Sequence, residues 1–360
     1  MQPGPVSPFK DEPFMVAGTA DRRDRPTMKD VAAVAGVSLK TVSRVVNGEA
    51  GVLPHTEAQV RQAIAELGFR RNDGARQLRT GRTAGIGLVV ENVADPFYSL
   101  LTGAVEQVAR EHGCLLFTGS SEDDPQREAE LALAFCARRV DGLVIVPAAS
   151  DHSYLGPELG SGLAVAFVDR PPIGLAVDTV LTANTQGAHD GVAHLLAHGH
   201  RRIGYLGDAE RIYTSAERVR GYRDAMAAAG APINESWISL GPPEPARIRS
   251  VIDQLLGAQP AVTALFTGNN RLTVTVLREL AARRWPPGSY RPALLGFDDF
   301  ELADLLRPAV SVVAQDPAGL GRHAAELLFA RLGGQRTPPR RITLPTRIIA
   351  RGSGEAPPAS

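Results

Sequence analysis

The chain has 360 residues, 44% of them hydrophobic and 22% charged, and its 39 basic residues balance its 39 acidic ones. This length exceeds one ordinary domain, and the composition excludes a largely disordered protein. Its two cysteines, Cys114 and Cys136, have no CxxC partner, which argues against a disulfide framework and against a zinc site. We expect two or three domains in a reducing compartment, with no metal and no cofactor.

The first segment, residues 1–26, combines proline, glycine and mixed charge and lacks the apolar run of a signal peptide. It is predicted to be a disordered leader, and residues 353–360 are predicted to be a disordered tail. No later stretch is long and apolar enough to span a membrane. These features predict a cytoplasmic protein that does not engage a membrane.

The charge is unevenly distributed along the chain. Residues 27–82 hold nine basic and five acidic residues, a net charge of +4, and the leader holds four of each. Since the whole chain is neutral, the remainder carries −4. A small basic head on an acidic body is expected when only the head contacts phosphates.

Residues 27–71 show the pattern of three short helices. Thr27 and Asp30 form a capping-box arrangement, Gly36 permits a sharp turn, and Ser38 can cap a second helix. A third helix is expected over about 54–67, although its N-cap position holds a leucine that cannot cap. Two short helices joined by a glycine-containing turn predict a helix-turn-helix domain.

The second helix of this domain has outward-facing side chains that suit base edges in the major groove. The alternative is an ordinary three-helix domain with a solvated basic face. The residues predicted to contact DNA are Leu39, Lys40, Thr41, Ser43 and Arg44.

The segments MKDVAAVAGVSLKTVSRVVNG, ELGFRRN and ARQLRTGRTAGIGLVV decide between these readings. They closely resemble the lactose-repressor (LacI) family of transcriptional regulators, and the resemblance runs from Thr27 to about Gly352. It implies that Leu39, Lys40 and Arg44 read bases of double-stranded, near-palindromic operator DNA. It also implies a homodimer.

The same resemblance implies a hinge helix in residues 72–82 that enters the minor groove. Asn72 would cap it, Arg76 would contact DNA, and Leu78 would wedge into the central base step. Asp73 and Gly74 replace better helix formers here. We therefore expect a hinge that folds only with DNA and the dimer partner present.

Beyond the hinge, apolar runs alternate with amphipathic helical stretches, which predicts two α/β lobes with a cleft between them. The predicted strands are residues 85–90, 114–120, 142–147, 163–169, 202–207, 264–269, 293–299 and 310–315. Residues 83–352 would form this core, which binds an effector and dimerises.

The resemblance implies that the core is periplasmic-binding-protein-like and that its chain crosses between lobes three times. We expect crossings near Asn184, Gln315 and Pro338. The first lobe would then comprise about 84–184 and 315–335. The second would comprise 185–314 and 340–352.

Ligands of such sheets bind beyond the carboxyl ends of the strands, where several polar and aromatic residues fall. Arg218 is added because the family carries an effector-contacting arginine there. Two of the others have structural alternatives, since Asp95 can simply cap a helix and Asp298 can belong to a turn. The predicted effector-binding residues are Asp95, Phe97, Tyr98, Asp169, Arg170, Arg218, Asn270 and Asp298.

A sugar is the predicted effector, with a nucleobase, a nucleoside or an anionic metabolite as alternatives. Where many family members have Asn-Asp, this chain has Asn269 and Asn270. The exchange removes a charge but keeps donor and acceptor capacity, so an uncharged polyol remains compatible.

The sequence disfavours two other classes of protein, an enzyme and an extracellular solute-binding protein. An enzyme is disfavoured because no G-x-G-x-x-G follows a strand and there is no P-loop; His194 and His198 share a helical face, but HxxxH alone is a weak metal signal. An extracellular solute-binding protein would need a signal peptide and no DNA-binding head. The sequence predicts a regulator rather than an enzyme, with repression favoured by family habit.

Overall fold

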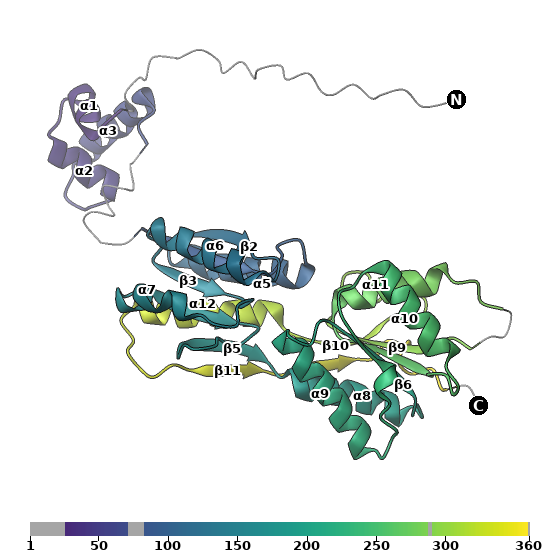
Figure 1. Cartoon of the computed structure of the whole chain (residues 1–360). Helices are drawn as coiled ribbons and strands as arrows, with labels where there is room; N and C mark the ends of the chain where they lie inside the picture. The colour runs from purple at the N-terminus through teal and green to yellow at the C-terminus, as the bar shows by residue number, and fades with distance from the viewer. Residues whose placement is uncertain (1–25, 71–82, 287–289, 359–360) are drawn as a thin grey trace, which may run out of the picture. The chain divides into compact units, whose positions relative to one another are not determined.

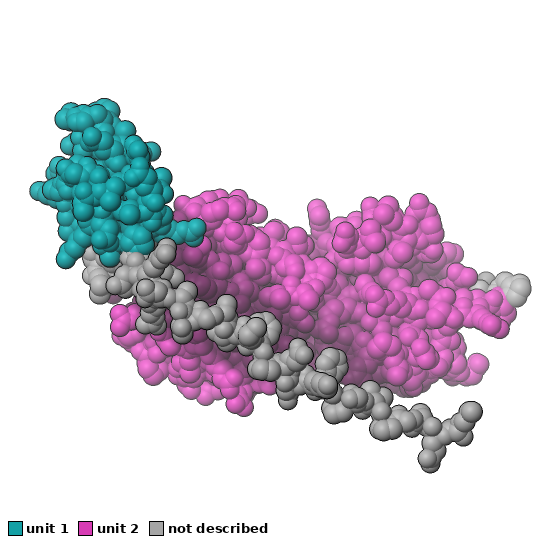
Figure 2. All heavy atoms as spheres, turned by 90° about the horizontal axis from the view of Figure 1, so that it is seen from above, with its two compact units in different colours: residues 1–81 teal, residues 82–360 magenta. Residues whose placement is uncertain are grey.

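The protein is described by a computed structural model over residues 26–70, 83–286 and 290–358. It divides into two compact units, residues 1–81 and 82–360 (Figure 2). Residues 1–25 of the predicted leader lie outside the described residues, as do the hinge residues Asn72, Arg76 and Leu78. None of the helices in the described ranges is long and apolar enough to cross a membrane.

The first unit contains the three predicted helices, α1 (Met28–Ala35), α2 (Leu39–Asn47) and α3 (Pro54–Leu67). Each contributes apolar side chains to a single small core, so the helices hold one another in place. The fully buried members of this core are Val31, Val42, Val60 and Ala63. The helix-turn-helix prediction is confirmed.

The ends of these helices follow from local chemistry. Thr27 N donates to Asp30 Oδ2 over 2.7 Å, and Asp30 N donates to Thr27 Oγ1 over 3.4 Å, which completes the capping box. Gly36 ends α1 with a φ of 65°, a left-handed conformation that suits glycine. Leu53 precedes α3 without a side-chain cap, as its chemistry requires.

The first lobe of the second unit is a six-stranded parallel sheet in the order β11-β5-β4-β3-β1-β2 (Figure 1). Helices α5 and α12 pack on one face and α6 and α7 on the other. Apolar strands covered on both faces explain the continuous apolar runs in the sequence. The strands are β1 (Gly85–Val90), β2 (Leu115–Ser120), β3 (Gly142–Ile145), β4 (Ala164–Val168), β5 (Asp178–Thr182) and β11 (Arg341–Leu344), and the helices are α5 (Pro96–Glu111), α6 (Pro125–Ala137), α7 (Gly156–Gly160) and α12 (Pro317–Leu332).

The second lobe repeats this plan in the order β12-β10-β9-β8-β6-β7, with only β12 antiparallel to its neighbour. Helices α8 and α9 cover one face and α10 and α11 the other. The strands are β6 (Ile203–Gly207), β7 (Ile238–Leu240), β8 (Ala264–Thr267), β9 (Ala293–Phe297), β10 (Ser311–Ala314) and β12 (Arg347–Ile349), and the helices are α8 (Asn184–Ala197), α9 (Tyr213–Ala228), α10 (Pro245–Gly257) and α11 (Asn270–Ala282).

The chain passes between the lobes three times. It leaves β5 of the first lobe directly into α8 of the second, and it returns from β10 into α12. The third crossing was expected near Pro338, but β11 still belongs to the first lobe because Arg341 pairs with Thr179. The crossing therefore lies between Leu344 and Arg347.

The predicted disordered tail instead lies against the second lobe over residues 353–356. Ser353 is buried, and its hydroxyl donates to the Leu294 carbonyl over 2.5 Å. His200 Nε2 donates to the Ala356 carbonyl over 2.8 Å. Composition alone suggested disorder, because it does not show that polar groups of a short segment will find buried partners.

Candidate functional site

The first turn of α2 presents its predicted DNA-contacting side chains toward solvent. Leu39 is 45% exposed and Lys40 is also exposed, whereas Val42 on the opposite side of the helix is fully buried. The Thr41 hydroxyl lies 2.9 Å from the Ser38 hydroxyl, and the Ser43 hydroxyl accepts from Asn47 Nδ2 over 3.2 Å. One helix thus carries all five predicted side chains, with Leu39, Lys40, Thr41 and Ser43 in its N-terminal part and Arg44 in its last turn.

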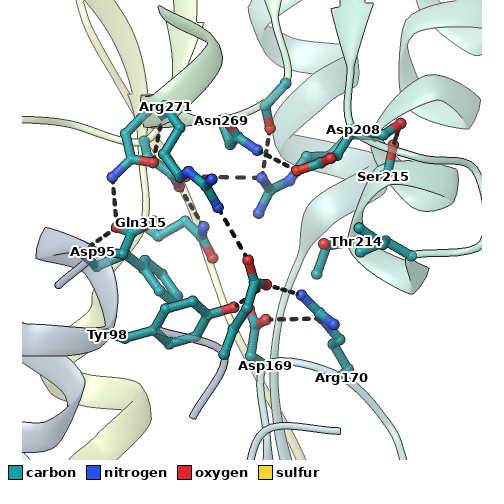
Figure 3. A pocket seen from close by; sticks show the side chains of 17 residues that line it. Asp95, Tyr98, Asp169, Arg170, Asp208, Thr214, Ser215, Asn269, Arg271 and Gln315 are labelled. Carbon is teal, nitrogen blue, oxygen red and sulfur yellow. Dashed lines mark hydrogen bonds and ion pairs between the residues drawn. The ribbon is translucent and has the colours of Figure 1, made fainter. Parts of the chain in front are cut away.

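A pocket lies where the carboxyl ends of the strands of the two lobes meet (Figure 3). Residues from both lobes line it, and they include all eight that the sequence analysis selected. Those eight are Asp95, Phe97, Tyr98 and Asp169 with Arg170, Arg218, Asn270 and Asp298.

The placement of the lining follows from the strand ends. Glu91, Asp169, Asp208, Asp298 and Gln315 each come directly after a strand, namely β1, β4, β6, β9 and β10. Because parallel strands end at the same edge of their sheet, the two sheets direct these side chains into one cleft.

Arg218 of α9 is held rigidly in the pocket wall. Its Nε donates to Asn184 Oδ1 over 2.8 Å and one terminal nitrogen donates to the Gly268 carbonyl over 2.6 Å. Its guanidinium lies 3.8 Å from the centre of the Phe297 ring and 3.8 Å from Asp298. This buried cation is fixed in place before any ligand arrives.

Asp169 and Asp298 hold equivalent positions in the two lobes. Both follow buried strands, and both adopt a φ of 71°, a left-handed conformation that aspartate tolerates better than most residues. Burial raises the pKa of Asp169 to about 6, although Arg170 and Arg218 oppose the shift. Burial likewise raises the pKa of Asp298, against the effects of Arg218 and of a hydrogen bond from Gln315.

Asp95 both caps a helix and binds a residue of the opposite lobe. Its Oδ1 accepts from the Phe97 amide over 2.9 Å, which caps α5. The same oxygen accepts from Asn270 Nδ2 over 2.9 Å, and this bond joins the first lobe to the second across the pocket.

Glu91 is the centre of the charged network on the pocket wall. It lies 2.5 Å from Arg170 and 3.3 Å from Arg271 of the opposite lobe, and it accepts from the Tyr98 hydroxyl over 3.2 Å (Figure 3). Burial and the nearby Glu91 raise the pKa of Tyr98, so its phenol stays protonated. Arg170 also binds Asp123 over 2.6 Å.

The sequence analysis missed about half of the pocket lining. Several of the missed residues follow strands whose ends had been predicted, so the strand-end rule could have found them. Others begin α9 or α11 and gave no separate signal. The lining residues outside the predicted set are Glu91, Asp208, Ile212, Thr214, Ser215, Gly268, Asn269, Arg271 and Gln315.

The histidines at the end of α8 make structural contacts. His194 Nε2 lies 2.5 Å from Glu355, and His200 is fully buried with its Nδ1 3.0 Å from the Thr263 hydroxyl. Within residues 26–70, 83–286 and 290–358, no three histidine, cysteine or carboxylate side chains gather to hold a metal ion.

Two family models match the chain. Residues 27–72 match the family described as bacterial regulatory proteins, lacI family, and residues 192–354 match a periplasmic binding protein-like domain. These matches agree with the helix-turn-helix head and with the two-lobed α/β core.

Relatives extend the likeness over almost the whole chain. The HTH-type transcriptional regulator CelR of Thermobifida fusca is 34% identical over 93% of this chain and 100% of its own length. GalS of Salmonella typhimurium is 32% identical over 86% of this chain and 90% of its own.

Solved structures agree in fold. A lac repressor dimer bound to operator and an anti-inducer superposes with a TM-score of 0.79 at 24% identity, over 92% of this chain and 99% of that one. A CelR–cellobiose complex superposes with a TM-score of 0.65 at 30% identity, over 91% of this chain and 100% of that one. The length and identity of these matches show that the chain belongs to the LacI/GalR family of bacterial transcriptional regulators.

Proposed function

We propose that the protein is a sequence-specific repressor whose affinity for operator DNA is set by a small sugar in the interlobe pocket. The observation that carries the proposal is the origin of the lining, which comes from both lobes of the core. A ligand held there contacts both lobes, so its binding favours one relative placement of them over others.

The charges of the pocket favour a neutral ligand. Its lining contains five carboxylates, of Glu91, Asp95, Asp169, Asp208 and Asp298. It contains three guanidinium groups, of Arg170, Arg218 and Arg271. This excess of two negative charges disfavours an anionic metabolite, whereas sugar hydroxyls can both donate to carboxylates and accept from guanidinium groups.

A nucleobase or nucleoside is the weaker alternative. Phe97 and Tyr98 pack edge to face with ring centroids 5.0 Å apart, and both are buried. Their faces are therefore largely used within the first lobe and are poorly placed to stack on a base. Names of relatives also point to sugars, since one solved complex contains cellobiose and another protein is named a putative ribose operon repressor.

On the DNA side, we assign base and phosphate contacts to Leu39, Lys40, Thr41, Ser43 and Arg44 of α2. The exposure of the first turn of this helix supports the assignment. Asn72, Arg76 and Leu78 of the hinge would complete the interface in the minor groove. A regulator of this kind acts in the cytoplasm, where the chromosome lies.

A homodimer is part of the proposal because the core leaves large apolar side chains uncovered. Leu302 and Leu305, between β9 and β10, are 57% and 64% exposed. Leu115 and Phe117 of the edge strand β2 are also exposed. Large apolar side chains exposed in pairs favour a protein interface, and two heads would then meet two half-sites of a near-palindrome.

The first experiment is selection of duplexes from a random pool by the purified full-length protein at moderate salt. Enrichment of a near-palindrome is expected. If no sequence is enriched even after cell metabolites are added, sequence-specific regulation by this protein is contradicted.

The enriched duplex then serves as a fluorescent probe for a panel of sugars, nucleosides and anionic metabolites. We expect a sugar to change the operator affinity by about 5- to 150-fold, the usual range of allosteric coupling. Arg218→Ala should abolish this change, because it removes the fixed cation. Arg249→Ala, which removes an arginine paired with Glu279 outside the pocket, should preserve it. A response to nucleosides or anions alone would replace the sugar assignment.

A further inference from the structure

A second hollow adjoins the effector pocket. It also lies between the lobes, because residues of both line it. Arg170 and Ile212 line both spaces and therefore form the boundary between them. The cleft thus has two adjoining compartments.

The second compartment has a different character from the first. The first lobe contributes Pro147, Pro171 and Ile173, and the second lobe contributes the half-buried ring of Tyr213. Apolar and aromatic surfaces with a few polar groups at their edges suit the alternating apolar and hydroxylated faces of a sugar ring.

The polar edge of this compartment is an ion pair that a ligand can replace. Arg211 of the second lobe lies 2.7 Å from Asp123 of the first, and the arginine side chain is 62% exposed. Exposed ion pairs contribute little to stability, since water screens them and ordering the side chains costs entropy. Hydroxyl groups of a bound ring can therefore take over the exposed donors of Arg211 at small cost, while Asp123, whose side chain is 12% exposed, keeps its bond to Arg170 over 2.6 Å.

We propose that the effector is an extended saccharide of two linked rings, with one ring in the pocket and the second in this adjoining compartment. The inference rests on the proposed sugar-responsive function and specifies its ligand. A single ring in the pocket would not contact Ile173 or the ring of Tyr213, whose hydroxyl accepts from Arg341 over 3.3 Å, although both side chains line the adjoining compartment. A second ring would contact both lobes again, and so would add to the selectivity for the closed placement.

The test is calorimetric titration of the full-length protein with matched pairs of sugars, namely glucose with cellobiose, glucose with maltose, and galactose with lactose. In at least one pair the disaccharide should bind about tenfold or more tightly than its monosaccharide, a difference of about 1.4 kcal/mol. Equal affinities in every pair would overturn the second compartment but leave the sugar-responsive regulator intact. Absence of binding by every saccharide would overturn both.

Variants locate the second ring. Ser150 is an exposed residue of the compartment, and Ser150→Trp should fill the space without disturbing the core. Ser150→Trp and Tyr213→Ala should each remove the advantage of the disaccharide while the monosaccharide affinity changes less than about twofold. Arg249→Ala is the control, because Arg249 is 63% exposed and pairs with Glu279 outside both compartments. It should leave both affinities unchanged. Retention of the full advantage in both compartment variants would place the second ring elsewhere and overturn the proposal.

Discussion

Asp169 shows how burial outweighs neighbouring charge at a single residue. Only 4% of it is exposed, and its pKa lies near 6 in spite of two adjacent arginines. Because this pKa is raised above the unfolded value of 3.8, the folded state binds the proton more tightly. The stability gained in this way is fully present below about pH 4 and is lost as the pH rises through 6.

Asp169→Asn should therefore stabilise the ligand-free protein at pH 7.5. The pKa difference of about two units corresponds to roughly 3 kcal/mol at most, and we expect an increase of about 1–3 kcal/mol in the free energy of unfolding. The measurement is urea unfolding of both proteins between pH 5 and 7.5. The gap should narrow as the pH falls, and a gap that does not vary with pH would show that burial does not shift this carboxyl.

Lys40 carries the second prediction at this scale. Its exposed position in the first turn of α2 suits a base contact in the major groove. Lys40→Ala should relax the preference at one position of each half-site, at a cost of about 1–3 kcal/mol.

The readout for Lys40 is repetition of the duplex selection with the variant. Lys29→Ala changes an exposed lysine of α1 and is the matched control, which should keep the selected sequence. A uniform loss of affinity across all sequences would identify Lys40 as a phosphate contact instead.

The sequence could predict the residues of the pocket only where a recognisable strand ended in polar side chains. That rule identified Asp169 and Asp298, and the family resemblance added Arg218. It could not identify Arg271, because this residue lies within α11 and reaches the pocket only through its pairing with Glu91 of the opposite lobe. Contacts that join two lobes depend on their relative placement, which no local pattern contains.

At the scale of elements, continuously apolar strands were predictable, and strands that carry polar or charged side chains were not. All eight predicted strands are present, with ends that differ by a few residues. The strands β5, β7, β11 and β12 were not predicted. They have three to five residues and carry polar or charged side chains; β7, β11 and β12 are edge strands, and β5 lies next to an edge strand.

The missed strand β11 also explains why the third crossing was misplaced. The family resemblance placed the crossing near Pro338, but Pro338 and Pro339 only precede β11. Pro345, which separates the alternating runs of β11 and β12, marks the crossing.

The C-terminal segment supplies the prediction at this scale. Ser353 and Glu355 bond to β9, β10 and α8, and their loss leaves the Ser311 hydroxyl and the Leu294 amide without these partners. Removal of residues 353–360 should destabilise the core by about 2–4 kcal/mol, since several buried polar groups lose hydrogen bonds.

The measurement is thermal unfolding followed by circular dichroism. Removal of Ala359 and Ser360 alone is the control and should leave the midpoint unchanged. An unchanged midpoint in the longer truncation would contradict a structural role for the segment.

At the scale of the whole core, four polar bridges join the lobes in the described residues. They link Arg271 to Glu91, Asn270 to Asp95, Arg211 to Asp123, and Arg341 to the Tyr213 hydroxyl. Arg271 and Arg211 are partly exposed, so each of their ion pairs should contribute less than about 1 kcal/mol. Together they favour a closed placement that modest energies can shift.

The double variant Arg211→Ala/Arg271→Ala should therefore populate open cores. Small-angle X-ray scattering should give a larger radius of gyration than for the parent protein, since two of the four bridges are gone. The control Arg249→Ala should scatter like the parent. A double variant with the parental radius would show that the three segments crossing between the lobes, rather than these bridges, hold the lobes together.

The three crossings between lobes have a consequence for synthesis on the ribosome. The first lobe requires β11 and the second requires β12, so both sheets wait until residues 341–349 have been synthesised. The head has its own core within residues 28–69 and can fold as soon as it emerges. A nascent chain thus carries a folded head long before it has a finished core. A premature stop anywhere before residue 341 would release a head with neither lobe complete, and hence without the site through which an effector could act.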